Sequence, residues 1–339
     1  MTAEDQVLAG VIAGDVRAVA RACRMVDDRW PGHLELLRGL YPQSRGSWWI
    51  GITGSPGVGK STLTSRLIQH LRAAQQRVAV VAVDPSSPFR GGALLGDRIR
   101  MQAHWADPEV FIRSLATRGA LGGLSRTTAD VARVLSAWGA AVVLIETVGV
   151  GQDELDVMRV AHTTLVVQAP GAGDDLQAAK AGLLECADVF AINKADLPGA
   201  DSAAQHLHGM LALAGVTASA RGLGGHAGHH GAVVGAESGT SQGWEVPVLS
   251  CVAQRDEGIA ELLLSLQRHF TWLSTSPAGQ ARRVERSRGE LLALLRERLS
   301  EVLLERQHAE MEGLAERVSR GELDPYTAVQ ALLGSAGLA

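Results

Sequence analysis

The stretch GITGSPGVGKSTL, residues 51–63, carries the strongest indication of the fold. It contains the pattern G-x-x-x-x-G-K-S between a short apolar run and an amphipathic stretch, which is the context that a phosphate-binding loop requires. Glycines 54, 57 and 59 let the backbone turn tightly, so that successive N–H groups point at phosphate oxygens beside the positive end of the following helix. A glycine-rich turn with a chance lysine is the alternative, and this context disfavours it.

The side chains of this loop have separate expected roles. Lys60 is expected to reach the β- and γ-phosphates of a nucleotide, and the hydroxyl of Ser61 to ligate Mg²⁺. The sequence therefore predicts a site for a nucleoside triphosphate. The other loop residues expected to contact the nucleotide are Ser55, Gly57, Val58, Gly59 and Thr62.

Short apolar runs alternate with amphipathic stretches from residue 48 onward. Each run is nearly all apolar, as expected for strands of a sheet that is covered on both faces. Amphipathic stretches such as 61–76, where Leu63, Leu67 and Leu71 recur, predict helices between the strands. The alternation predicts an α/β fold with a mostly parallel central sheet flanked by helices. The expected strands are 48–54, 77–84, 140–146, 163–169, 188–194 and 246–251.

Both ends of the chain lack this alternation. Residues 1–46 carry apolar side chains near helical spacing and predict an N-terminal helical extension. Residues 276–339 predict a C-terminal helical arm, which packs back on the sheet domain or meets a second copy. The phosphate-loop domain is then expected over 47–275. The apolar stripe of the arm consists of Leu292, Leu295, Leu299 and Val302.

The pattern N-K-x-D in AINKAD, residues 191–196, predicts the identity of the base. The carboxylate of Asp196 would accept from the N–H groups on the Watson–Crick edge of guanine, with Asn193 and Lys194 beside it. Adenine offers no such pair of donors, so the site would reject ATP and bind GTP or GDP. The expected backbone contact to guanine O6 falls in Ser250, Cys251 and Val252.

Carboxylates at the ends of the expected strands are candidate ligands for Mg²⁺. Glu146 ends one apolar run and Asp84 another, while Asp97 lies in the glycine- and proline-rich segment 84–101. For Asp84 and Asp97 a helix cap or a surface salt bridge stays open as an alternative. The segments 84–101 and 170–182 are predicted to be switches that γ-phosphate and Mg²⁺ order.

Two further residues are candidates for the catalytic set, beside Lys60 and Glu146. The amide of Gly149 is expected to contact the γ-phosphate. Lys180 is a cation that could reach a phosphate, with a solvated helix lysine as the equal alternative.

Composition bounds the class of protein. The 339 residues are 46% hydrophobic and 20% charged with a formal charge of -4, which suits a core with appendages and gives no support for a nucleic-acid partner. Neither a signal peptide nor a membrane-spanning run is expected. The three scattered cysteines suit a reducing cytoplasm and exclude a zinc site built from cysteine pairs.

A glycine-rich stretch in the second half gathers histidines. Such clusters can bind Ni²⁺ or Zn²⁺, although a flexible loop without a metal is the favoured interpretation. The histidines are His206, His208, His226, His229 and His230.

Long stretches of the chain resemble the MeaB/ArgK family, the P-loop GTPases that chaperone methylmalonyl-CoA mutase. The resemblance implies a SIMIBI-class GTPase fold that binds GTP or GDP and Mg²⁺, and it surrounds Mg²⁺ with Ser61, Asp84, Asp97 and Glu146. The stretches are GITGSPGVGKSTL (51–63), VDPSSPFRGGALLGDRIRM (83–101), FIRSLATRGALGGLS (111–125), IETVGVGQDELDV (145–157), PGAGDDLQAAKAGLLECADVFAINKAD (170–196) and GELDPYTAVQALL (321–333).

The resemblance also implies a cellular role. GTP hydrolysis would gate the transfer of adenosylcobalamin from an adenosyltransferase to the mutase, and would protect or reactivate that mutase in the cytoplasm. The segment 170–182 resembles the third switch of the family, with Asp174 and Lys180 in matching places, and the C-terminal arm resembles a homodimerisation arm. Ras-like proteins carry a glutamine where this chain has Val150, so we expect slow hydrolysis that a partner accelerates.

The chain departs from the family pattern at a few positions. Ala140 and Ala141 stand where many members have an aromatic residue and Asp, Cys251 replaces the common alanine, and the histidine-rich insertion is unusual. Other cobalamin-dependent acyl-CoA mutases therefore stay open as clients. A nickel metallochaperone GTPase that uses the loop 221–243 is the main alternative, and an ATP-dependent kinase is a third, which the N-K-x-D pattern opposes.

Overall fold

The computed structural model divides the chain into two compact units, Met1–Gln280 and Ala281–Ala339. Each unit has its own hydrophobic core. The residues that the structure describes are 2–84, 104–116, 123–147, 160–171, 186–220 and 243–335.

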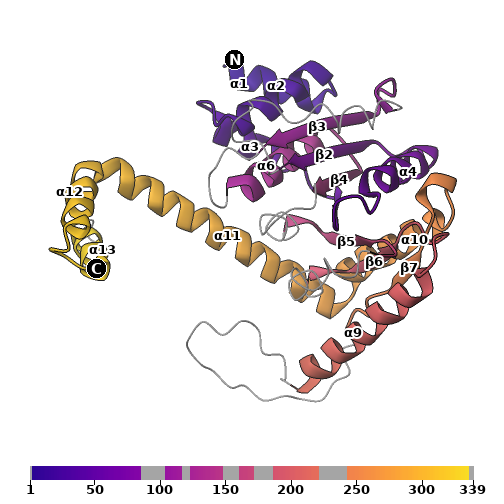
Figure 1. Ribbon diagram of the computed structural model, residues 1–339. Coiled ribbons are helices and arrows are strands. Elements are labelled where there is room, and N and C mark those ends of the chain that lie inside the picture. The colour runs from indigo at the N-terminus through magenta and orange to yellow at the C-terminus, as the bar shows by residue number, and fades with distance from the viewer. Residues whose placement is uncertain are drawn as a thin grey trace. The chain divides into compact units, whose positions relative to one another are not determined.

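A seven-stranded, all-parallel sheet forms the centre of the larger unit, in the order β3-β2-β4-β1-β5-β6-β7 (Figure 1). This confirms the predicted α/β fold, and six of the strands coincide with the six predicted runs. The strands are β1 Trp48–Thr53, β2 Val78–Asp84, β3 Val110–Ala116, β4 Val142–Thr147, β5 Thr163–Gln168, β6 Val189–Ile192 and β7 Val248–Ser250.

Strand β3 was not predicted. Arg113 and Ser114 interrupt its apolar run, and this edge strand is paired to β2. The guanidinium of Arg113 forms an ion pair with Asp27 of the N-terminal extension at 2.9 Å. A polar interruption that a neighbouring helix neutralises is invisible to a search for continuous apolar runs.

Side chains alternate along each strand, so the two faces of the sheet support separate cores. Trp49 and Ile50 illustrate this, because they are adjacent in β1 and belong to different cores. Helices α1, α2, α3 and α6 cover the first face, and α4 and α10 cover the second. The bounds are α1 Ala3–Ile12, α2 Val16–Asp27, α3 His33–Leu40, α4 Lys60–Ala73, α6 Gly123–Ala137, α9 Ala200–Ala220 and α10 Ile259–Thr275.

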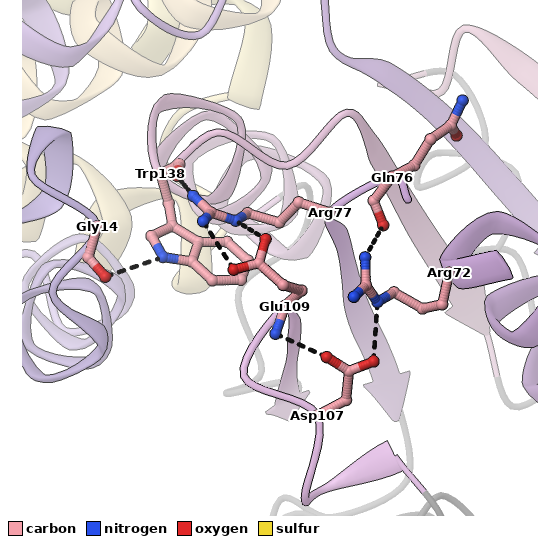
Figure 2. Close-up of polar contacts among 7 residues, drawn as sticks. All are labelled: Gly14, Arg72, Gln76, Arg77, Asp107, Glu109 and Trp138. Carbon is pink, nitrogen blue, oxygen red and sulfur yellow. Dashed lines mark hydrogen bonds and ion pairs between the residues drawn. The ribbon is translucent and has the colours of Figure 1, made fainter. Parts of the chain in front are cut away.

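A polar cluster fastens the N-terminal extension at the end of the sheet where the strands begin (Figure 2). Arg77 precedes β2 and binds the carboxylate of Glu109 through two hydrogen bonds of 2.7 and 2.9 Å, which lower the pKa of that carboxyl group. Its guanidinium lies 4.7 Å from the ring centroid of Trp138, whose indole N–H donates to the carbonyl of Gly14 at 3.4 Å. This arrangement leaves the opposite edge of the sheet, where the strands end, available for a ligand.

The smaller unit is helical, as predicted for the C-terminal arm. It contains most of α11 Pro277–Arg306, together with α12 His308–Ser319 and α13 Pro325–Ser335. The last two helices share a small core of Leu314, Ala328 and Leu332. The carboxylate of Asp324 caps α13 by accepting the backbone N–H of Thr327 at 2.9 Å.

Across the described ranges, helices long enough to cross a bilayer are not apolar enough to do so.

Candidate functional site

The phosphate-binding loop connects β1 to α4 at the edge where the strands end. Gly54 and Gly59 adopt φ values of 143° and 97°, which side chains other than glycine rarely adopt. A Cβ atom on Gly54 would collide with the carbonyl oxygen of Val167, and one on Gly59 with the side-chain amide nitrogen of Asn193. Glycine at these positions therefore lets the loop pack against β5 and the end of β6.

Lys60 is the first residue of α4 and is buried, with 6% of its side chain exposed. Its ammonium donates to the carbonyls of Gly54 at 2.5 Å and Ser55 at 3.1 Å. The first-turn amides of a helix have no acceptor within that helix. A cation and a ring of N–H donors thus lie together, which is a suitable cradle for phosphate oxygens.

Ser61 and Glu146 lie in contact, although 85 residues separate them. The serine hydroxyl donates to Oε1 of the glutamate at 2.6 Å, because β4 is hydrogen-bonded to β1. A hydroxyl and a carboxylate are hard oxygen donors of the kind that Mg²⁺ prefers. The chemistry of this pair therefore fits the ion that the fold implies.

The other predicted Mg²⁺ ligands are only partly placed. Asp84 ends β2, and β2 pairs with β4 so that Val83 lies beside Thr147, which brings the backbone of Asp84 to the same edge. The side chain of Asp84 is outside the described part of the structure. The same holds for the whole of Asp97, Gly149, Asp174 and Lys180.

Asn193 joins the phosphate loop to the region that follows β7. Its side-chain amide donates to the carbonyl of Val58 at 2.8 Å, and its carbonyl oxygen accepts the N–H of Ala253 at 3.0 Å. Lys194 has a φ of 58° and extends back across the loop, where its ammonium donates to the carbonyl of Gly57 at 2.7 Å. Two residues of the N-K-x-D pattern thus hold the phosphate loop in place.

A cavity of about 140 Å³ brings the phosphate loop and Asp196 together. Its lining consists of Gly59, Thr62, Asn193, Lys194, Asp196, Leu197, Val252, Ala253 and Gln254. A second cavity of about 360 Å³ shares Asp196 and Val252 with the first. Its other lining residues are Ala195, Ser250, Cys251, Arg255, Glu257 and Gly258.

We call residues 250–258 the base loop; it follows β7 and contains the short helix η2 Ala253–Arg255. Arg66 of α4 fixes this loop, because its guanidinium donates to the carbonyls of Ala253 at 2.9 Å and Gln254 at 2.8 Å. Cys251 is buried, and burial raises the pKa of its thiol to about 12. The thiol is therefore protonated and acts as a small apolar side chain at neutral pH.

Sequence reasoning missed several residues of this site. Leu197, Ala253 and Gln254 adjoin predicted residues, so a wider window around each motif would include them. Arg66 carries no signal of its own, since it lies on the polar face of an amphipathic helix. Its role follows from the packing of α4 beside the base loop.

The predicted histidine cluster is only partly described. His206 and His208 are exposed on α9, and His226, His229 and His230 lie outside the described residues. Within the described ranges, His, Cys, Asp and Glu side chains do not gather in groups of three or more that could hold a metal ion.

Comparisons with known proteins identify the family. A family model described as methylmalonyl Co-A mutase-associated GTPase MeaB matches residues 19–308. A Pyrococcus abyssi protein that bears a GTPase name is 40% identical over 330 residues, which are 97% of this chain and 95% of that protein. The fused isobutyryl-CoA mutase of Cupriavidus metallidurans is 39% identical over 198 residues, which are 57% of this chain and 18% of that protein.

A solved structure described as LAO/AO transport system kinase has 26% sequence identity and a TM-score of 0.65, and the match covers 98% of this chain and 97% of that one. Family model, full-length relative and fold agree with the site geometry. The chain belongs to the MeaB family of P-loop GTPases.

Proposed function

We propose that this GTPase binds GTP and GDP with Mg²⁺ at the edge formed by the phosphate loop, residues 193–196 and the base loop. The observation that carries this proposal is the cavity that Gly59 and Thr62 share with Asn193 and Asp196. One end of that cavity supplies phosphate donors, and the other supplies a carboxylate that can accept from guanine.

The residues of the chain divide the chemistry among them. Lys60 and the first-turn amides of α4 bind the β- and γ-phosphate oxygens and hold them in position. Ser61 and Glu146 would hold Mg²⁺, with Asp84 and Asp97 as further ligands. The ion would neutralise the charge that develops on the phosphate oxygens when it is bound. Gly149 and Lys180 are proposed contacts to the transferred phosphate.

Substitution of Asp196 by Asn tests the assignment of the base. The variant loses the charged acceptor for two N–H donors of guanine, each worth about 1.5–3 kcal/mol, so affinity for GDP should fall by about 100-fold or more. Xanthosine diphosphate presents acceptors that match the new amide and should bind more tightly than to the native protein. Competition against a fluorescent nucleotide measures both affinities.

Asp201→Asn is a matched control, because Asp201 is exposed in the first turn of α9. This variant should retain the native preference for GDP. A loss of GDP affinity in Asp196→Asn without any gain for the xanthine nucleotide would argue against guanine reading by Asp196.

We further propose that the GTP cycle gates delivery of adenosylcobalamin to a cobalamin-dependent acyl-CoA mutase, of which methylmalonyl-CoA mutase is the first candidate, and protects or reactivates that enzyme. The family description supports a mutase partner, and a stretch similar to this chain is part of a fused isobutyryl-CoA mutase in Cupriavidus metallidurans. An adenosyltransferase is the proposed donor of the cofactor, and the cytoplasm the proposed location.

Co-purification with methylmalonyl-CoA mutase and with isobutyryl-CoA mutase, each in GDP and in a non-hydrolysable GTP analogue, tests this role. We expect nucleotide-dependent retention of one mutase and faster single-turnover GTP cleavage in its presence. Retention of neither mutase, or equal cleavage rates with and without them, would contradict the chaperone role while leaving the GTPase assignment intact.

A further inference from the structure

The carboxylate that is proposed to read guanine already has a cationic partner. Nη2 of Arg255 lies 2.8 Å from Oδ2 of Asp196. Both side chains line the second cavity beside Ser250 and Cys251, at the position proposed for the base. An arginine that donates to Asp196 in this space uses the same oxygen atoms that the N–H groups of guanine require.

A second acceptor for Arg255 lies within the same turn of the base loop. Nε of Arg255 is 3.6 Å from Oε1 of Glu257. Two backbone hydrogen bonds between Val252 and Glu257, of 3.0 and 3.3 Å, close this turn and keep the glutamate beside the arginine. The guanidinium is therefore placed between two carboxylates, of which only Asp196 lines both cavities.

We propose that Arg255 competes with guanine for Asp196. Arg255 neutralises the carboxylate while the base pocket is empty, and it shifts to Glu257 when guanine enters. This regulation rests on the proposed reading of guanine by Asp196. It makes the nucleotide-free state less costly, because the aspartate retains a partner, and it thereby weakens nucleotide binding and favours exchange.

The size of the effect follows from exposure. The side chains of Arg255 and Asp196 are 54% and 38% exposed, so the pair is largely solvated and screened by salt. A pair of this kind corresponds to roughly a two- to fivefold change in affinity. Arg255 therefore tunes affinity without preventing binding, and the exposed guanidinium is free to move between its two acceptors.

Arg255→Gln is the direct test, with GDP affinity measured by titration calorimetry on the full chain. The variant should bind GDP roughly two- to fivefold more tightly at low ionic strength, and the gain should shrink as salt is added. Glu257→Gln should weaken GDP binding, because Arg255 then has only Asp196 to pair with. Arg268→Gln, which removes an exposed cation from α10, is the control for net charge and should change nothing.

Weaker GDP binding by Arg255→Gln would mean that the arginine contacts the nucleotide, and unchanged binding would mean that the pair does not compete; either result overturns the proposal. The Asp196→Asn background separates it from the proposed site. There, Arg255→Gln should leave the affinity for xanthosine diphosphate unchanged, since no carboxylate remains. Failure of Asp196→Asn to favour that nucleotide would refute the site itself, whereas failure of Arg255→Gln alone would refute only the competition.

Discussion

Gly59 lies at the closest approach between the phosphate loop and Asn193. The Gly59→Ala variant should hydrolyse GTP about 100-fold more slowly, because the new Cβ collides with the side-chain amide of Asn193 and displaces the loop from the phosphates. Steady-state phosphate release measures the effect.

Gly46→Ala is the matched control for that substitution. Gly46 has a φ of 95°, close to the 97° of Gly59, but open space surrounds its Cβ position. Both variants should lose about 1–2 kcal/mol of stability to backbone strain, and only Gly59→Ala should lose activity. Equal losses of activity would show that strain, and not the collision, is responsible.

His104 is a buried residue whose protonation is linked to folding. Its Nε2 lies 2.8 Å from the hydroxyl of Ser65 on α4, and burial lowers the pKa of the imidazole, against a smaller opposing effect of Asp107. The unfolded chain takes up a proton near pH 6.5, whereas the folded chain does so only at lower pH. The stability from this group is therefore full above about pH 6.5 and is lost as pH falls through the interval between the two pKa values.

His104→Gln should flatten this part of the pH profile. Urea unfolding at pH 8, 6 and 5 would show the difference between native protein and variant narrowing toward low pH. His206, which is exposed on α9, supplies the control variant His206→Gln. A constant difference at the three pH values would contradict the linkage.

At the scale of elements, the N-terminal extension is part of the main core. Leu36 of α3 is 1% exposed and belongs to the cluster that includes α6 and one face of the sheet. Leu36→Ala should lower the free energy of unfolding of the larger unit by about 2–5 kcal/mol in urea titrations followed by tryptophan fluorescence. Ile12→Ala, at a side chain that is 48% exposed, should change it by no more than about 0.5 kcal/mol. A separate transition for the extension would show that it folds independently.

Elements differed in how far sequence predicted them. Strands β1, β2, β4, β5, β6 and β7 were predictable because both faces of each are covered, which requires continuous apolar runs. Strand β3 was not, since Arg113 is neutralised by Asp27 from a distant helix. In the site, Lys60, Ser61 and Asp196 belong to local motifs, whereas Arg66 and Arg255 act through contacts that only the folded chain creates.

At the scale of the whole molecule, α11 presents apolar side chains to solvent. Leu292, Leu295 and Leu299 are 43%, 54% and 42% exposed, and their spacing puts them on one face of the helix. We propose that this face pairs with a second copy of the chain to form the homodimer. Replacing all three by Ser should convert a dimer into a monomer in light scattering coupled to gel filtration, with basal GTP hydrolysis retained.

Leu264→Ser is the control, because Leu264 on α10 is 47% exposed and lies in the larger unit. It should leave the dimer unchanged. A native protein that is monomeric over the whole concentration range would refute the proposal. The sequence-based domain boundaries at 46/47 and 275/276 remain predictions.

By itself, the sequence determined the parallel sheet, the phosphate loop and the N-K-x-D pattern, because each depends on neighbouring residues: apolar runs specify buried strands, and glycines specify a loop that can approach phosphate. Tertiary structure alone decided which distant groups meet. The contacts of Ser61 with Glu146, Arg66 with the base loop and Arg255 with Asp196 arise because parallel strands all end at one edge of the sheet, and no local pattern records that convergence.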